Sequence, residues 1–192
     1  AMWMFIKWNY DMQFLAGLAQ GDLALGTGWA GNLGKAGFKG EASYFIPVTE
    51  TAVNQSYDGL FLGAISVDYS FPNTLYLNGS VLYNSVAELN PSFGFSFVGA
   101  RPGNFTVRNI SNYRWSSFMQ SSYQFTPLFS GGLSVIVYPG SNAFFVNPAL
   151  TVSLKQNFDL DVVGQLFFDE DPLNGDYGSV SQSGFVRLKW SF

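Results

Sequence analysis

The chain has 192 residues, of which only 11% are charged and 18% are aromatic, and its formal net charge is −4. Ordinary soluble domains carry roughly 25% charged residues, so a soluble protein of this composition would tend to aggregate. The negative charge argues against nucleic acid as a partner, and the absence of cysteine and histidine excludes disulfides and the usual thiolate and imidazole metal sites.

Alternating hydrophobicity predicts that most of the chain forms β-strands. A two-residue period gives a strand one apolar and one polar face. Even positions in 2–18 are apolar, which predicts one long first strand. No run of about 18 apolar residues is present, as a transmembrane helix would require. The following strands are predicted, in chain order, at residues 23–30, 37–46, 60–71, 75–86, 113–125, 128–138, 143–155, 158–169 and 184–192.

The last predicted strand carries the most specific motif. Its apolar and polar residues alternate, and the chain ends on Phe192, two residues after Trp190. This ending resembles the C-terminal strand of bacterial outer-membrane β-barrels, which the barrel-assembly machinery recognises. The resemblance implies an all-β, transmembrane, antiparallel up-and-down β-barrel in the bacterial outer membrane, surrounded by lipid bilayer and lipopolysaccharide. The alternating pattern of such barrels extends over the whole chain, whereas their terminal motif is matched only by the nine residues 184–192.

About ten strands in a single domain, 1–192, are expected, or twelve if residues 87–112 form a further hairpin. The predicted turns are short on one side and mostly long on the other, as in bacterial barrels. An even count would place both termini in the periplasm, with the strand at 10–18 pairing with 184–192 to close the barrel. Two alternatives stay open. One is a soluble β-sandwich, although the predicted outward faces carry almost no charge. The other is the C-terminal part of a wider barrel, if strands precede Ala1.

Ten charged residues are predicted to face the barrel interior, and their charges cancel. They are Lys7, Lys39, Lys155, Arg187, Lys189, Asp11, Glu41, Asp68, Asp159 and Asp161. Charges in a narrow, side-chain-filled interior must be paired. We therefore expect one of the last two acids to form a salt bridge with Arg187 or Lys189. The set is interpreted either as a neutral salt-bridge plug or as a charged constriction that selects solutes.

The longest predicted connection, residues 87–112, is rich in phenylalanine. Exposed phenylalanines are a liability in water, so this segment is expected to fold into the extracellular mouth or to form a hairpin above it. The residues assigned to the mouth are Phe93, Phe95, Phe97, Arg101, Phe105, Arg108 and Arg114.

An acidic segment precedes the last predicted strand, with Asp169, Glu170, Asp171 and Asp176. Neighbouring carboxylates can hold Ca²⁺ or Mg²⁺, but the spacing lacks the pattern of a known calcium loop. A solvated loop is the simpler interpretation, and no cofactor is expected. No serine stands in a recognisable catalytic motif and no histidine base is available, so an enzyme is not expected either.

Two functions follow from the barrel resemblance. The first is a narrow channel or porin-like transporter for small solutes, with a charge-paired lumen and a mouth restricted by the phenylalanine-rich loop. The second is a non-transporting barrel whose extracellular loops dock a partner protein or lipopolysaccharide. Conductance in planar bilayers distinguishes the two.

Overall fold

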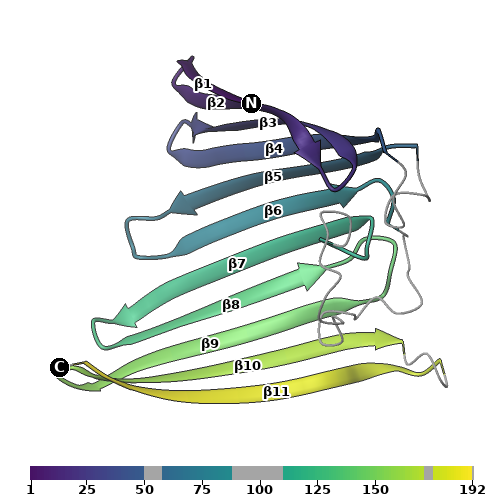
Figure 1. Ribbon diagram of the computed structural model, residues 1–192. Helices are drawn as coiled ribbons and strands as arrows, with labels where there is room; N and C mark the ends of the chain where they lie inside the picture. Colours follow the sequence, from purple (N-terminus) through teal and green to yellow (C-terminus); the bar gives the residue numbers. More distant parts are fainter. Residues whose placement is uncertain (50–57, 88–109, 171–174, 192) are drawn as a thin grey trace. The chain divides into compact units, whose positions relative to one another are not determined.

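A computed structural model describes residues 1–49, 58–87, 110–170 and 175–191, which form eleven β-strands in one antiparallel sheet (Figure 1). The sheet order follows the chain, so each strand pairs with the next. Across the described ranges, no helix has the length and apolar character that a membrane crossing requires. The strands are β1 Met2–Lys7, β2 Tyr10–Ala19, β3 Asp22–Leu33, β4 Ala36–Pro47, β5 Leu60–Ser70, β6 Tyr76–Asn84, β7 Trp115–Thr126, β8 Phe129–Val137, β9 Phe144–Lys155, β10 Phe158–Glu170 and β11 Tyr177–Trp190.

The sheet confirms the predicted all-β, antiparallel up-and-down architecture, but it has eleven strands where ten were expected. The additional strand arises because residues 2–18 form two strands, β1 and β2, instead of one. They are joined at Trp8 and Asn9, whose φ angles are 54° and 61°. Two successive left-handed residues form the tight turn that matches the twist of a β-hairpin. The last strand is also longer than predicted, since β11 begins at Tyr177.

Among the described residues no ladder joins β1 to β11, so the sheet is not closed into a barrel by strand pairing. The predicted closing pair, between residues 10–18 and 184–192, is wrong because β2 already pairs with β1 on one edge and with β3 on the other. In the described sheet β1 and β11 are the edge strands. Eleven is an odd number, so these two strands run in the same direction. The expectation that both termini lie at the same end depended on an even count and does not hold.

The chain divides into two compact units, each with two chemically different faces. Unit 1 comprises residues 1–67 and 80–116, and unit 2 comprises residues 68–79 and 117–192. In unit 1, the ladders place Asp11, Ala30 and Lys39 side by side on one face of β2, β3 and β4. The same ladders place Met12 and Trp29 on the other face. We call these the polar face and the apolar face of the unit.

Unit 2 repeats this division along β9, β10 and β11. On its polar face Asp161 pairs with Arg187, and on its apolar face Val162 pairs with Leu150 and Val186. Residues adjacent in the chain therefore point to opposite faces, as the two-residue period predicts. The alternation correctly assigned the faces of this hairpin.

The additional turn changes the face on which the side chains of β1 lie. Lys7 pairs with Tyr10 across the turn and so lies on the apolar face, with its ammonium 4.4 Å from the centroid of the Trp8 ring. The prediction that Lys7 shares an interior face with Asp11 is therefore wrong. Ile6 takes that position instead, because it pairs with Asp11.

A substitution at Asn9 tests the turn. Asparagine tolerates the left-handed region, whereas a β-branched residue does not. We expect Asn9→Val to destabilise the β1–β2 hairpin by about 1 kcal/mol, and Asn9→Gly to leave it unchanged. Amide hydrogen exchange in β1 should then accelerate about fivefold in the valine variant. In an unbroken strand, valine would be neutral or stabilising, so slower exchange would contradict the turn.

A buried apolar cluster occupies part of the polar face of unit 1. It consists of Ala24, Phe45 and Leu60. Ala24 and Phe45 are ladder partners, and Phe45 lies on the same face of β4 as Lys39. In unit 2, Phe167 is likewise buried on the polar face. The expectation of an interior filled by charge pairs is therefore incomplete, because apolar side chains fill part of it.

Candidate functional site

An ion pair joins β10 and β11 on the polar face of unit 2. One carboxylate oxygen of Asp161 accepts a hydrogen bond from Nε of Arg187 at 2.8 Å and lies 2.7 Å from Nη2 of the same side chain. The other oxygen accepts a hydrogen bond from the Thr151 hydroxyl at 2.8 Å. The predicted salt bridge between these two strands is confirmed. Both oxygens of Asp161 are bound, while the guanidinium of Arg187 remains largely exposed.

A shallow cavity lies beside this ion pair. It has a volume of about 520 Å³, and Val163 and Phe185 contribute apolar walls next to Arg187. Asp159 and Lys189 are ladder partners two positions further along the same face. This end of the polar face therefore combines alternating charges with exposed apolar surface.

A larger groove lies on the polar face of unit 1. Its volume is about 720 Å³, and residues of β1 to β5 line it. The predicted interior charges Asp11, Lys39 and Glu41 are all among them. A Cβ atom added at Gly28 would lie 2.7 Å from Nε2 of Gln13. The Gln13 side chain therefore lies over Gly28, and it fits there because glycine has no side chain. We call this hollow the unit 1 groove.

Two predicted interior charges, Asp68 and Lys155, are not among the residues that line the unit 1 groove or form the ion pair. Asp68 is two residues after Ser66 on β5, and Ser66 lines the unit 1 groove, so alternation places Asp68 on the polar face. Lys155 ends β9 at a register shift opposite Phe158. Alternation does not assign a face at such an irregularity.

The charges on the polar face do not cancel as predicted. Removing Lys7 and Lys155 from the ten predicted residues leaves eight, of which three are basic and five are acidic. Among these eight residues the acidic ones outnumber the basic ones by two, and counting Lys155, whose face alternation does not assign, the excess is one. The hairpin at the start of the chain accounts for one of these charges, because it turns Lys7 to the apolar face.

Of the residues predicted at the extracellular mouth, the structure describes Arg114. Its Nε donates a hydrogen bond to the carbonyl oxygen of Ala87 at 2.9 Å. This contact ties together the two ends of the longest connection. The remaining predicted mouth residues lie outside the described residues, namely Phe93, Phe95, Phe97, Arg101, Phe105 and Arg108.

Sequence reasoning missed a polar network next to Arg114. Asn84 is fully buried; its Nδ2 donates to the carbonyl oxygen of Ser111 at 3.0 Å, and its Oδ1 accepts from the backbone N–H of Val86 at 3.2 Å. The hydroxyls of Ser111 and Ser116 lie 2.9 Å apart. Short polar side chains at strand ends often form hydrogen bonds to the backbone in this way. The asparagine and serine residues at these strand ends were therefore the signal from which the network could have been predicted.

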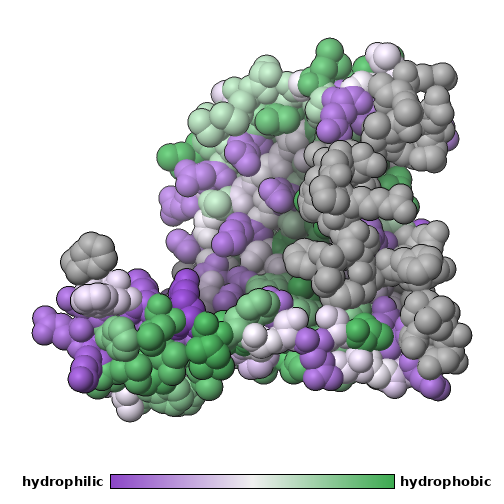
Figure 2. Space-filling model, turned by 60° about the horizontal axis from the view of Figure 1, so that its bottom comes forward, coloured by the Kyte–Doolittle hydropathy of each residue, from purple (hydrophilic) through white to green (hydrophobic). Residues whose placement is uncertain are grey.

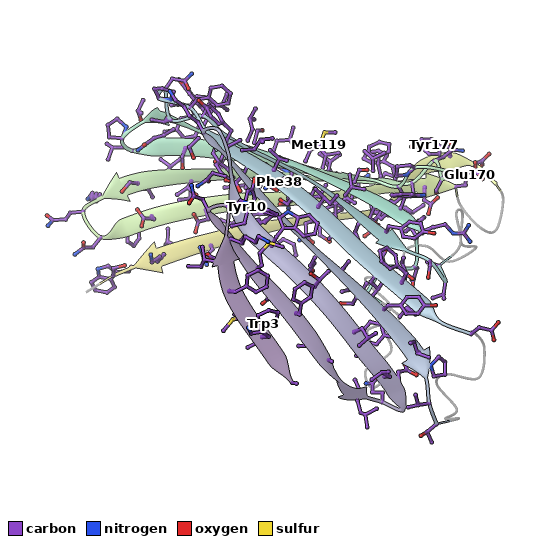
Figure 3. All side chains as sticks on the ribbon, turned by 90° about the horizontal axis from the view of Figure 1, so that it is seen from above. Trp3, Tyr10, Phe38, Met119, Glu170 and Tyr177 are labelled. Carbon is purple, nitrogen blue, oxygen red and sulfur yellow. The ribbon has the colours of Figure 1, made fainter. Side chains whose placement is uncertain are left out.

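One member of the predicted acidic cluster, Glu170, is engaged in protein contacts at the end of β10. Glu170 accepts a hydrogen bond from Nδ2 of Asn142 at 2.8 Å, and the Tyr177 hydroxyl donates to the carbonyl oxygen of Asn142 at 3.1 Å. Figure 3 shows Glu170 and Tyr177 beside each other, as their ladder pairing requires. These contacts hold the β10–β11 hairpin against the connection between β8 and β9, to which Asn142 belongs.

Oδ1 of Asp169 accepts a hydrogen bond from the backbone N–H of Glu170 at 2.8 Å, and the Asp169 carboxylate also acts on Tyr138. Burial, and then the negative charge of Asp169, raise the pKa of the Tyr138 hydroxyl above its ordinary value. Within the described parts of the chain, which include Asp176 but not Asp171, no three potential metal ligands come together.

Aromatic rings pack against glycines on the apolar face of unit 1. Phe38 contacts Tyr10 edge to face, with 6.3 Å between ring centroids, and lies 5.9 Å from the Trp29 ring (Figure 3). The Tyr10 ring covers Gly31 and the Trp29 ring covers Gly40, where a Cβ atom would collide with either ring. These rings lie near the turns at 8–9 and 34–35.

Unit 2 carries rings beside its own short turn at residues 127–128. Phe125 and Phe129 stack with a centroid separation of 4.9 Å. Trp190, one of the two residues predicted to signal assembly, lies exposed opposite Phe158 on the apolar face, whereas Phe192 lies outside the described residues. No protein-family model, curated protein or solved structure matches the chain, so its function is inferred from its own residues.

Proposed function

We propose that the chain forms the wall of a β-barrel in the bacterial outer membrane, where it acts as a narrow, porin-like channel for small solutes. The observation that carries the proposal is the exposure of the apolar faces. Leu18 of unit 1 is 77% exposed and Val186 of unit 2 is 72% exposed. Figure 2 shows hydrophobic side chains gathered at the end of unit 2 where β11 finishes. Such surfaces are unfavourable in water, and lipid is the solvent that suits them.

The dimensions of the strands support this proposal. From β2 to β11 the strands are 9 to 14 residues long, and a tilted strand needs about 9–11 residues to cross a bilayer. Backbone groups that face hydrocarbon must be hydrogen-bonded. The proposal therefore requires that the edge strands β1 and β11 are paired when the protein lies in the membrane.

The lengths of the connections support an orientation. At one end of the strands the turns are short, at residues 8–9, 34–35, 71–75, 127–128 and 156–157. At the other end one turn, at residues 20–21, is also short, whereas the remaining connections are longer, and the longest comprises residues 85–114. Bacterial barrels keep short turns in the periplasm, so the end of β11 would face the periplasm. The barrel-assembly machinery would recognise this strand during insertion.

The polar faces support a narrow lumen rather than a wide pore. The ion pair of Asp161 and Arg187 projects from one unit, and the cluster of Phe45 and Leu60 occupies the polar face of the other. Both reduce the space available to water. The excess of acidic residues would favour small cations over small anions.

The same apolar cluster favours a second candidate function. If Phe45 and Leu60 block the lumen, the protein would be a non-transporting barrel. Its extracellular loops would then dock a partner protein or lipopolysaccharide. This candidate shares the membrane location and differs only in conduction.

Recordings from the full chain in planar lipid bilayers test the proposed function. We expect small, discrete conductance steps with a reversal potential that indicates preference for cations, because acidic residues outnumber basic ones on the polar face. Protein inserted at the same density after heat denaturation is the control. Insertion without current would favour the docking barrel, and large, stable currents would contradict a narrow lumen.

A further inference from the structure

The unit 1 groove has a feature that a water-filled lumen does not explain. Met4 and Ile6 lie on the polar face, and they are 64% and 76% exposed. Both belong to β1, whose side chains change face because of the turn at residues 8–9. Large exposed apolar side chains next to charged groups commonly mark a ligand site.

One carboxylate lies directly beside this apolar wall, and a second lies across the floor of the groove. Asp11 is the ladder partner of Ile6 and also of Ala30 on the floor of the groove. Glu41 is the ladder partner of Gly28, the other floor residue. Lys39 is the one basic residue among the described residues that line the groove. The groove lining therefore has a net charge of −1, and its acidic groups flank a floor without bulky side chains.

A polar group is also available at the centre of the floor. Gln13 lies across Gly28 and projects into the groove. Its amide can donate to or accept from a bound molecule. A volume of about 720 Å³ lies within the range of small-molecule sites, roughly 300–1,000 Å³.

We propose that the unit 1 groove binds small organic cations of the alkylammonium class. The hydrocarbon part of the ligand contacts Met4 and Ile6, and its ammonium group lies between the carboxylates of Asp11 and Glu41. The site lies within unit 1 and does not depend on conduction through a lumen. Its existence and the proposed channel function can therefore fail independently.

The methionine methyl groups provide a direct readout. The full chain, folded in lipid nanodiscs and labelled with ¹³C at its four methionine methyls, is titrated separately with n-butylammonium, butyrate and 1-butanol. We expect saturable shifts of the Met4 methyl with n-butylammonium, and weaker binding of the alcohol and the carboxylate. The methyl of Met119, on the apolar face of β7, is the internal control for partition into lipid.

Substitutions then test the roles of the carboxylates. Asp11→Asn and Glu41→Gln should each raise the Kd for n-butylammonium about twofold to fivefold. Asp161→Asn, which removes a carboxylate from the polar face of unit 2, should leave the Kd unchanged. Equal, unsaturable shifts of the Met4 and Met119 methyls would overturn the proposal. Binding of butyrate as tight as that of n-butylammonium would also overturn it. Neither result would bear on conduction.

Discussion

Replacing Val162 by arginine is expected to lower the free energy of unfolding in lipid vesicles by about 2–4 kcal/mol, the cost of a cation on the lipid face near the bilayer midplane. Val162 lies on the apolar face of β10 and pairs with Leu150 and Val186, which are both apolar. It is 41% exposed. In a soluble protein, arginine at such an exposed position would change stability by about 0.5 kcal/mol or less.

The neighbouring residue offers a matched control. Val163 has the same side chain on the same strand, but it lies on the polar face, next to Phe185 and Arg187. Val163→Arg should cost much less than Val162→Arg, because its guanidinium would point away from lipid. Urea unfolding in vesicles, followed by tryptophan fluorescence, measures both. Equal losses for the two variants would contradict the assignment of the faces, and no loss for either would contradict the membrane location.

The alternation of the sequence was a reliable guide to the faces of β9, β10 and β11, for a physical reason. A ladder fixes which residues lie opposite each other, and a slip of one residue would turn every side chain to the other face. A salt bridge between Asp159 or Asp161 and Arg187 or Lys189 could therefore be predicted, because alternation places all four side chains on one face of two adjacent strands.

The first hairpin could not be predicted in the same way. Across a two-residue turn, the residues that flank it share a face, as Lys7 and Tyr10 do. In a continuous strand these two residues would face opposite sides. Trp8 and Asn9 are also not a typical turn pair, since glycine is missing. The available signal was the run of five apolar residues at 2–6, which does not alternate.

The error in one turn also changed the prediction of closure. One additional strand makes the count odd, so β1 and β11 run in the same direction and the expected antiparallel closing ladder is lost. Strand number is a global property, and local alternation does not constrain it. The ladders inside each unit were therefore predictable, whereas the ends of the sheet were not.

The buried cluster was missed because alternation assigns each residue to only one face. Phe45 stands between Tyr44 and Ile46, and Phe167 precedes Phe168, so apolar residues are consecutive at these strand ends. Consecutive apolar residues indicate a strand that is buried on both faces. Read in this way, the sequence does indicate where the polar face becomes apolar.

The importance of this cluster can be measured by truncating its most buried member. Leu60 is 0% exposed and packs with Ala24 and Phe45. Leu60→Ala is expected to lower the free energy of unfolding by about 2–5 kcal/mol, since it removes buried methyl groups and leaves a cavity. Leu25→Ala is the matched control, because Leu25 adjoins Ala24 but lies 43% exposed on the apolar face. The control should cost about 1 kcal/mol or less. Urea unfolding in vesicles measures the free energy of unfolding of both variants. If Leu60→Ala loses no more of it than Leu25→Ala, the cluster contributes little to stability and the polar face is open there.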